Sequence, residues 1–155
     1  AWDEWHCNCG PSALAAALQV KLSDVRSHIP GFEDKHYTSP QMMRAALDSL
    51  GVRFYDRRGS ANTQPCEWPE RGLVRIQWTG PWTRLGSNPR WAYNYTHWIA
   101  SWRCVGGHFV FDSNAGWTTA DEWIAKTVPF ILGHVKRSDG GWFPTNLCYL
   151  EGVVE

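Results

Sequence analysis

The sequence lacks an excess of charge of either sign. Its 155 residues carry 15 Lys and Arg against 15 Asp and Glu, so the formal net charge is +0. Nucleic acids and anionic membrane surfaces are usually bound through an excess of basic side chains, and the balance therefore argues against both as partners. The sequence also has no apolar run of about 18 residues, as a membrane-spanning helix requires. A charged segment followed by an apolar one, the pattern of a signal peptide, is missing too.

Cysteine is sparse and follows no recognisable pattern. The five cysteines are odd in number and irregularly spaced, which does not suit the disulfide framework of a secreted domain. No C-x₂-C pair and no H-E-x-x-H motif is present, so the sequence predicts no metal and no cofactor. We therefore expect a reducing, cytoplasmic location. The five are Cys7, Cys9, Cys66, Cys104 and Cys148.

Tryptophan, in contrast, is abundant, with 11 residues in the chain. Because each indole ring buries a large area, the simplest interpretation is that these rings fill the core of a small domain. The alternative is that some of them line a groove for an extended peptide or a sugar. Five of them lie near one another in the sequence around His97: Trp78, Trp82, Trp91, Trp98 and Trp102.

Helix signals fill the first third of the chain. Pro11 suits the first turn of a helix, where a missing N–H costs nothing. Ser39 followed by Pro40 is a good helix start, and Gly51 suits the position just after a helix end. The sequence predicts three helices, over residues 11–18, from Ser23 to before Pro30, and over residues 40–50.

Strand signals dominate the rest of the chain. Residues 105–107 suit the turn of a hairpin between two β-rich runs, and residues 119–124 resemble a short capped helix. Loops are predicted over 57–71 and 79–94, and we expect the second to wall a groove between the helices and the sheet. Helices followed by antiparallel strands predict a single α+β domain over residues 1–155, with N-terminal helices packed on a mainly antiparallel sheet. The predicted strands are 52–55, 73–78, 97–102, 108–111, 130–132 and 147–150.

A candidate nucleophile stands at the start of the first helix. The unpaired N–H groups and partial positive charge of a helix N-terminus favour a thiolate at Cys9. His97 opens one strand of the predicted hairpin, and Asp112 closes the other. Neighbouring antiparallel strands place such residues side by side, so we expect Asp112 to hold the Nδ1–H of His97, with Asn114 as the alternative.

Each of these residues also has a structural interpretation. A cysteine in an Ala- and Leu-rich helix commonly serves packing, and Asp-Ser-Asn before Ala-Gly is ordinary turn chemistry. A histidine at the start of a strand is often structural. The order of the three, with Cys9 at a helix start and then His97 and Asp112 on one hairpin, is what favours a catalytic interpretation.

Three segments carry a resemblance to a known family: Asn8-Cys9-Gly10-Pro11-Ser12-Ala13-Leu14-Ala15, His97-Trp98-Ile99-Ala100 and Phe111-Asp112-Ser113-Asn114. In order and spacing the chain resembles papain-like cysteine peptidases, and among them the bacteriocin-processing peptidases and their relatives. The resemblance implies a papain-like fold, with Cys9 as nucleophile, His97 as general base and acid, and Asp112 as the group that orients His97. It also implies a peptide or protein substrate, cleaved at a peptide or isopeptide amide through an acyl-enzyme.

The chain departs from the family at one position. The family usually has a Gln about six residues before the nucleophile, whose amide binds the oxyanion, and here that position is Asp3. Asn8 or His6 are candidate substitutes, and Cys7 is a second thiol that could act as a redox partner. Two other functions therefore stay open. One is a catalytically silent bacterial or phage-encoded interaction protein, and the other is an acyltransferase of the transglutaminase type.

Overall fold

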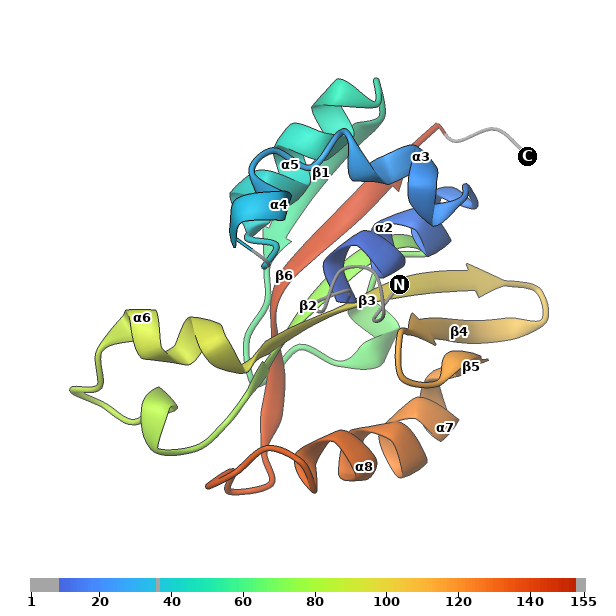
Figure 1. The fold of residues 1–155 in the computed structure, drawn as a ribbon. Helices are drawn as coiled ribbons and strands as arrows, with labels where there is room; N and C mark the ends of the chain where they lie inside the picture. The colour runs from blue at the N-terminus through green and yellow to red at the C-terminus, as the bar shows by residue number, and fades with distance from the viewer. Residues whose placement is uncertain (1–8, 36, 153–155) are drawn as a thin grey trace.

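The fold is known from a computed structural model that describes residues 9–35 and 37–152 (Figure 1). The helices are α2 (Cys9–Leu18), α3 (Leu22–Arg26), α4 (Phe32–Lys35), α5 (Pro40–Ser49), α6 (Pro89–Ala92), α7 (Ala120–Glu122) and α8 (Val128–Leu132). Shorter turns are η1 (Pro65–Glu67), η2 (Pro81–Thr83), η3 (Tyr93–Tyr95) and the π-helical η4 (Trp123–Thr127). The strands are β1 (Arg53–Arg58), β2 (Arg71–Trp78), β3 (Thr96–Cys104), β4 (Gly107–Asp112), β5 (Gly116–Thr119) and β6 (Trp142–Glu151).

The strands form a single six-stranded sheet in the order β1-β6-β2-β3-β4-β5. Every pairing between these strands is antiparallel. The predicted α+β class is therefore confirmed, and so is the packing of N-terminal helices on an antiparallel sheet. No helix in the described part of the chain is both long and apolar enough to cross a lipid bilayer.

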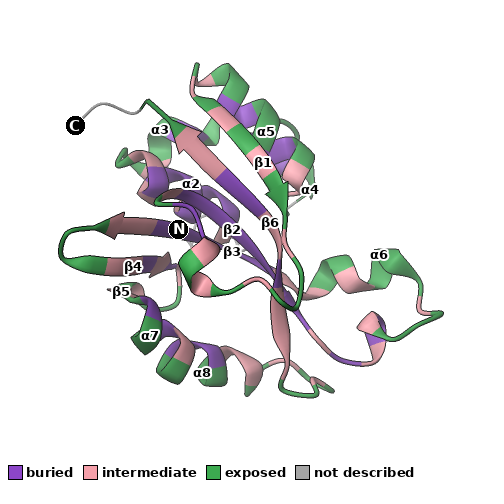
Figure 2. Ribbon diagram, turned by 180° about the vertical axis from the view of Figure 1, so that it is seen from behind, coloured by how far each residue is buried: buried purple, intermediate pink, exposed green. Residues whose placement is uncertain are grey.

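Helices cover both faces of the sheet, which creates two cores (Figures 1 and 2). Under α2, α3, α4 and α5, helix residues such as Leu14 pack on Leu73 and Trp98 of the sheet. On the opposite face, Trp123 of η4 and Val128 of α8 pack on the other side chains of the same strands. Side chains of a strand alternate between the two faces of a sheet. The central strand β2 is therefore buried on both sides, and every residue after Arg71 is buried.

Two of the five tryptophans near His97, Trp78 and Trp98, belong to these cores. Trp78, Trp82 and Trp98 are buried, whereas Trp91 remains well exposed. The indole N–H of Trp98 donates to the carbonyl of Thr38 at 2.8 Å, so this ring joins β3 to the segment before α5. For these three rings the packing interpretation is correct.

The predicted helices are confirmed with small shifts at their ends. Helix α2 begins two residues before the predicted start, so Cys9 is its first residue. The second helix begins before Ser23, with Lys21 at the N-cap. Ser39 caps α5 through its hydroxyl, which accepts from the N–H of Met42 at 3.2 Å. Gly51, with φ of +70°, follows the helix end in the left-handed conformation that glycine favours.

The strand predictions are correct in the centre of the sheet and fail in places near the C-terminus. Residues 130–132 form part of helix α8 instead of a strand. A run of three apolar residues is too short to distinguish the spacing of apolar residues in a helix from that in a strand. Phe130, the first of the three, is exposed. The last strand is longer than predicted because β6 begins at Trp142 and passes through Pro144. A bulge opposite Arg75 and Ile76 accommodates this irregular segment.

The remaining differences concern short elements. Strand β1 extends to Arg58, into the predicted loop 57–71. The predicted loop 79–94 contains the helical turns η2, α6 and the start of η3. Strand β5 precedes the capped helix predicted at 119–124, where the Thr119 hydroxyl accepts from the N–H of Glu122. Four-residue strands and single helical turns carry too little periodicity to be found in a sequence.

Candidate active site

Cys9 occupies the first position of helix α2, close to the start of strand β3. Helix α2 packs against β3 through the first core, in which Leu14 and Ala17 contact the Trp98 side of the sheet. The helix start is tightly held, since Gly10 and Pro11 are both buried. The fold therefore fixes a half-buried free thiol at the end of the sheet where His97 lies.

His97 and Asp112 are joined across the β3–β4 hairpin. Nε2 of His97 lies 2.9 Å from Oδ2 of Asp112, and both side chains are buried, with 7% and 0% of their surface exposed. The pairing predicted for the hairpin is therefore present, but through a different ring nitrogen than expected. Because Asp112 occupies Nε2, Nδ1 is the ring nitrogen left for the Cys9 sulfur, and each of Cys9 and His97 shifts the pKa of the other.

Asp112 is held by several donors besides His97. Its Oδ1 accepts from the backbone N–H of Asn114 at 2.8 Å and from the Asn114 side-chain amide at 2.9 Å. Its Oδ2 also accepts from the indole N–H of Trp123 at 2.8 Å. Asn114, the predicted alternative orienting group, thus donates to Asp112, which is itself the hydrogen-bond partner of His97. A carboxylate with this many donors is fixed in position and stays ionised.

Burial and charge act in opposite directions on the three groups. Burial alone would raise the pKa of the Cys9 thiol, but the hydrogen bond and charge of His97 and the backbone N–H groups of Trp98 and Gly10 lower it below its ordinary value. Burial alone would lower the pKa of His97, but Asp112 and the Cys9 sulfur raise it to about 10. The site therefore favours a thiolate beside an imidazolium at neutral pH.

Asp112 has the opposite shift from His97. Burial opposes its ionisation, but the hydrogen bond and charge of His97, with the donors from Asn114 and Trp123, lower its pKa to about 2. In contrast, burial and the nearby Asp56 raise the pKa of Cys148, a thiol in the core beneath α2. The fold thus distinguishes Cys9, which it activates, from Cys148, which it keeps protonated.

The segment that follows β2 is anchored beside this site. Trp78 stacks against the His97 ring with centroids 6.0 Å apart. The buried amide NH2 of Gln77 shares its two N–H donors among the carbonyls of Trp78, Ala92 and Tyr95 at 3.0 to 3.1 Å. Those three bonds tie the segment to the sheet, and they leave Gln77 without a donor for an oxyanion.

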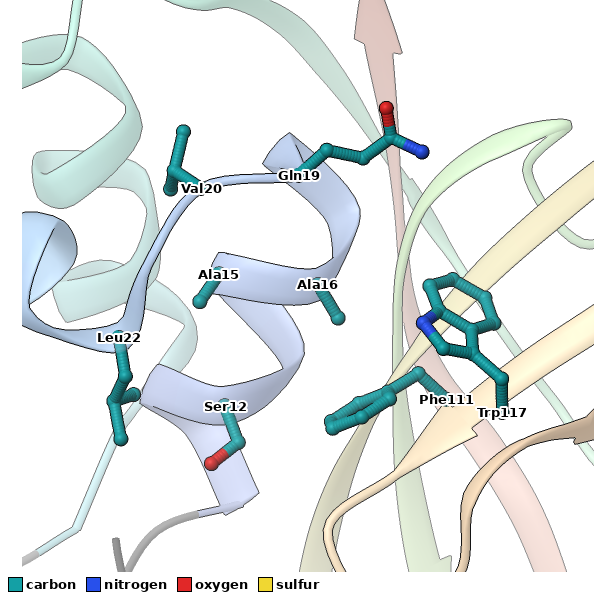
Figure 3. Close-up of a pocket in the computed structure, with 8 residues that line it drawn as sticks. All are labelled: Ser12, Ala15, Ala16, Gln19, Val20, Leu22, Phe111 and Trp117. Atoms are coloured by element: carbon teal, nitrogen blue, oxygen red, sulfur yellow. The ribbon is translucent and has the colours of Figure 1, made fainter.

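A cavity of about 480 Å³ opens one helical turn from Cys9. Figure 3 shows Ser12, Ala15 and Ala16 of α2 on one side of it and the rings of Phe111 and Trp117 on the other. The expected groove walled by residues 79–94 is not this cavity, which lies between α2 and the strands β4 and β5. The helical turns of 79–95 instead fold back on the sheet through Gln77 and the stacked pair Trp82 and Tyr95.

Comparison with known proteins does not assign the chain to a family: no protein-family model matches it, and neither does any curated protein sequence. Among residues 9–35 and 37–152, no three His, Cys, Asp or Glu side chains gather as metal ligands would.

Several residues beside the site were not found by sequence reasoning. Trp123 reaches Asp112 from η4, and Arg75 lies buried in β2 with its guanidinium near Thr96. The sequence holds a signal for Arg75 alone, since a charged residue within the apolar run 73–78 is unusual for a buried strand. Asp3, His6, Cys7 and Asn8, which entered the oxyanion and second-thiol hypotheses, lie outside the described residues.

The close fit at Gly10 gives a first testable prediction. A Cβ at this position would collide with the side chain of Thr38, so Gly10→Ala must displace the start of α2 or the Thr38 segment. We expect a loss of about 1–3 kcal/mol in the free energy of unfolding and slower alkylation of Cys9. Ala16→Ser, which adds one atom at a partly exposed position of the same helix, is the control. Equal free energies of unfolding for Gly10→Ala and Ala16→Ser would contradict the tight packing of Gly10 against Thr38.

Proposed function

We propose that the chain is a cysteine hydrolase of the papain-like fold that cleaves a peptide or isopeptide amide through an acyl-enzyme on Cys9. The observation that carries the proposal is the buried His97–Asp112 pair, hydrogen-bonded at 2.9 Å, beside a Cys9 thiol whose pKa His97 lowers. A nucleophile, a base in contact with it and a carboxylate that orients the base are the three parts that covalent acyl transfer requires.

The geometry gives each group a role. The Cys9 thiolate attacks the amide carbon, and the C–N bond breaks as His97 donates its proton to the leaving nitrogen. The carboxylate of Asp112 keeps Nε2 of His97 occupied, so that Nδ1 faces the sulfur throughout. Water then attacks the thioester, His97 takes the proton of that water, and the acid product leaves with the Cys9 thiolate restored. The N-terminal end of α2 favours the negative charge that develops beside Cys9.

A mixture of peptides from digested proteins tests the proposal even though the substrate is unidentified. We expect the wild-type protein to cleave a subset of peptides, as read by mass spectrometry, and to carry acyl adducts on Cys9 in acid-quenched samples. Cys9→Ala should abolish both. Cys66→Ala removes an exposed thiol outside the site and should leave both unchanged.

The same experiment separates the other two functions. An acyltransferase would form the adduct on Cys9 and release it faster when a primary amine is added, with the amine joined to the product. A catalytically silent protein would give neither cleavage nor adduct. Cleavage that persists in Cys9→Ala would contradict the proposal.

A further inference from the structure

Arg75 is a buried cation on the same face of the sheet as the Cys9 helix. Leu73, two residues earlier in β2, and Trp98, its partner in β3, both belong to the core beneath α2. Because side chains two residues apart in a strand share a face, Arg75 points to that face as well. Its exposed fraction is only 6%.

The contacts of the guanidinium are few and uncharged. Its Nη2 donates to the hydroxyl of Thr96 at 3.2 Å, and Thr96 is the residue before His97. The exposed ring of Tyr93 lies over the guanidinium, 4.7 Å from ring centroid to Cζ. The Nε atom is buried and has no hydrogen-bond partner. Within the described part of the chain, no carboxylate forms an ion pair with Arg75.

Burying the Arg75 guanidinium in this way lowers the stability of the fold. We therefore expect the side chain to have a role other than stabilisation. A buried cation with no carboxylate paired to it, and a buried N–H without an acceptor, both lower stability. Burial lowers the pKa of Arg75, and the negative forms of Tyr93 and Cys9 oppose that shift. The hydrogen bond to Thr96 places the guanidinium next to the residue that precedes His97.

We propose that Arg75 binds a carboxylate of the substrate next to the scissile amide, so that the chain prefers acidic substrates. This inference rests on the proposed hydrolase function and specifies the substrate class for the same site. The planar guanidinium fork suits a carboxylate, which it binds with two parallel hydrogen bonds. The carboxylate can come from an Asp or Glu side chain or from the C-terminus of a peptide.

Two alkylating reagents that differ only in charge test the inference directly. Iodoacetate carries a carboxylate next to the reacting carbon, and iodoacetamide carries a neutral amide there. In both reactions the Cys9 thiolate forms a thioether bond and iodide leaves. The ratio of the two rate constants, read at Cys9 by mass spectrometry, therefore reports anion recognition, while the iodoacetamide rate alone reports activation of the thiol.

We expect Arg75→Gln to lower the iodoacetate-to-iodoacetamide ratio at Cys9 by about tenfold, as expected for loss of a charged hydrogen-bond donor. Arg75→Lys keeps the charge without the planar fork and should give an intermediate ratio. Arg58→Gln removes the same charge from an exposed position of β1 and should leave the ratio within about twofold of wild type, because exposed charges are largely screened. A ratio unchanged in Arg75→Gln would overturn the inference.

The two proposals fail in different ways. A Cys9 that iodoacetamide labels no faster than an exposed thiol would count against the hydrolase, whatever the ratio does. Fast labelling with an unchanged ratio would count against the role of Arg75 alone. Matched peptides then identify the source of the carboxylate. Glu-to-Gln replacement beside the cleaved bond should slow cleavage if the source is a side chain, and C-terminal amidation should slow it if the source is the terminus.

Discussion

Replacement of His97 by Ala is expected to slow the reaction of Cys9 with iodoacetamide by about a hundredfold at about pH 6. In the wild type the imidazolium stabilises the thiolate by a hydrogen bond and by its charge, and it lowers the pKa of the thiol. Without His97, burial is the dominant influence on Cys9 and favours the thiol. Since only the thiolate reacts, the rate at a pH below the ordinary thiol pKa falls with the thiolate fraction.

Site-resolved mass spectrometry provides the controls for this prediction within a single sample. Cys66 is exposed and lies away from His97, so its rate should be the same in both proteins. Cys148 should remain unlabelled while the fold is intact, because burial raises its pKa. His97→Asn, which keeps a polar side chain, should behave like His97→Ala. Equal Cys9 rates in the wild type and both variants would show that His97 does not activate the thiol.

Asp112→Asn is expected to lower the free energy of unfolding by about 2 kcal/mol at neutral pH. The carboxylate is fully buried and accepts hydrogen bonds from His97, Asn114 and Trp123. An amide in its place turns an N–H toward groups that are themselves donors. The loss of the charge also removes the main stabilisation of the His97 imidazolium.

The cost of Asp112→Asn depends on pH in a defined direction. The pKa of Asp112 is lowered to about 2 in the folded protein. Its contribution to stability is therefore fully present above the pKa of the unfolded chain, about 4, and is lost as the pH falls toward 2. Denaturant unfolding of both proteins between about pH 7 and pH 2.5 should show the difference shrinking with acidity. Asp121→Asn, at an exposed site of α7, is the control, and a constant difference would contradict the account.

Local signals in the sequence were enough to predict the parts that hold the nucleophile and the base. Pro11 marks the first turn of α2, and Ser39 marks the start of α5. Gly106 and Gly107, at the turn from β3 into β4, mark the hairpin that joins His97 to Asp112. Each of these depends on the conformational preferences of a few adjacent residues, which a sequence displays directly.

Other features depend on contacts between distant segments, and the sequence did not display them. The pairing of Nε2 of His97 with Asp112, in place of Nδ1, depends on how the two side chains meet across the hairpin. Trp123 reaches Asp112 only because η4 packs on the second face of the sheet. The apolar run 130–132 is compatible with a strand or with a helix, and it forms part of helix α8 in the folded protein.

The protonation state of His97 tests the central claim most directly. Nuclear magnetic resonance of the labelled imidazole, followed from about pH 5 to pH 11, should show an imidazolium at pH 7 and a titration midpoint near 10. The pair with the Cys9 thiolate should thus persist at neutral pH and be lost as the pH rises through that midpoint. In Cys9→Ala the midpoint should fall, because one of the two negative partners is gone. A neutral His97 ring at pH 7, with a midpoint near the ordinary value of about 6.5, would contradict the account.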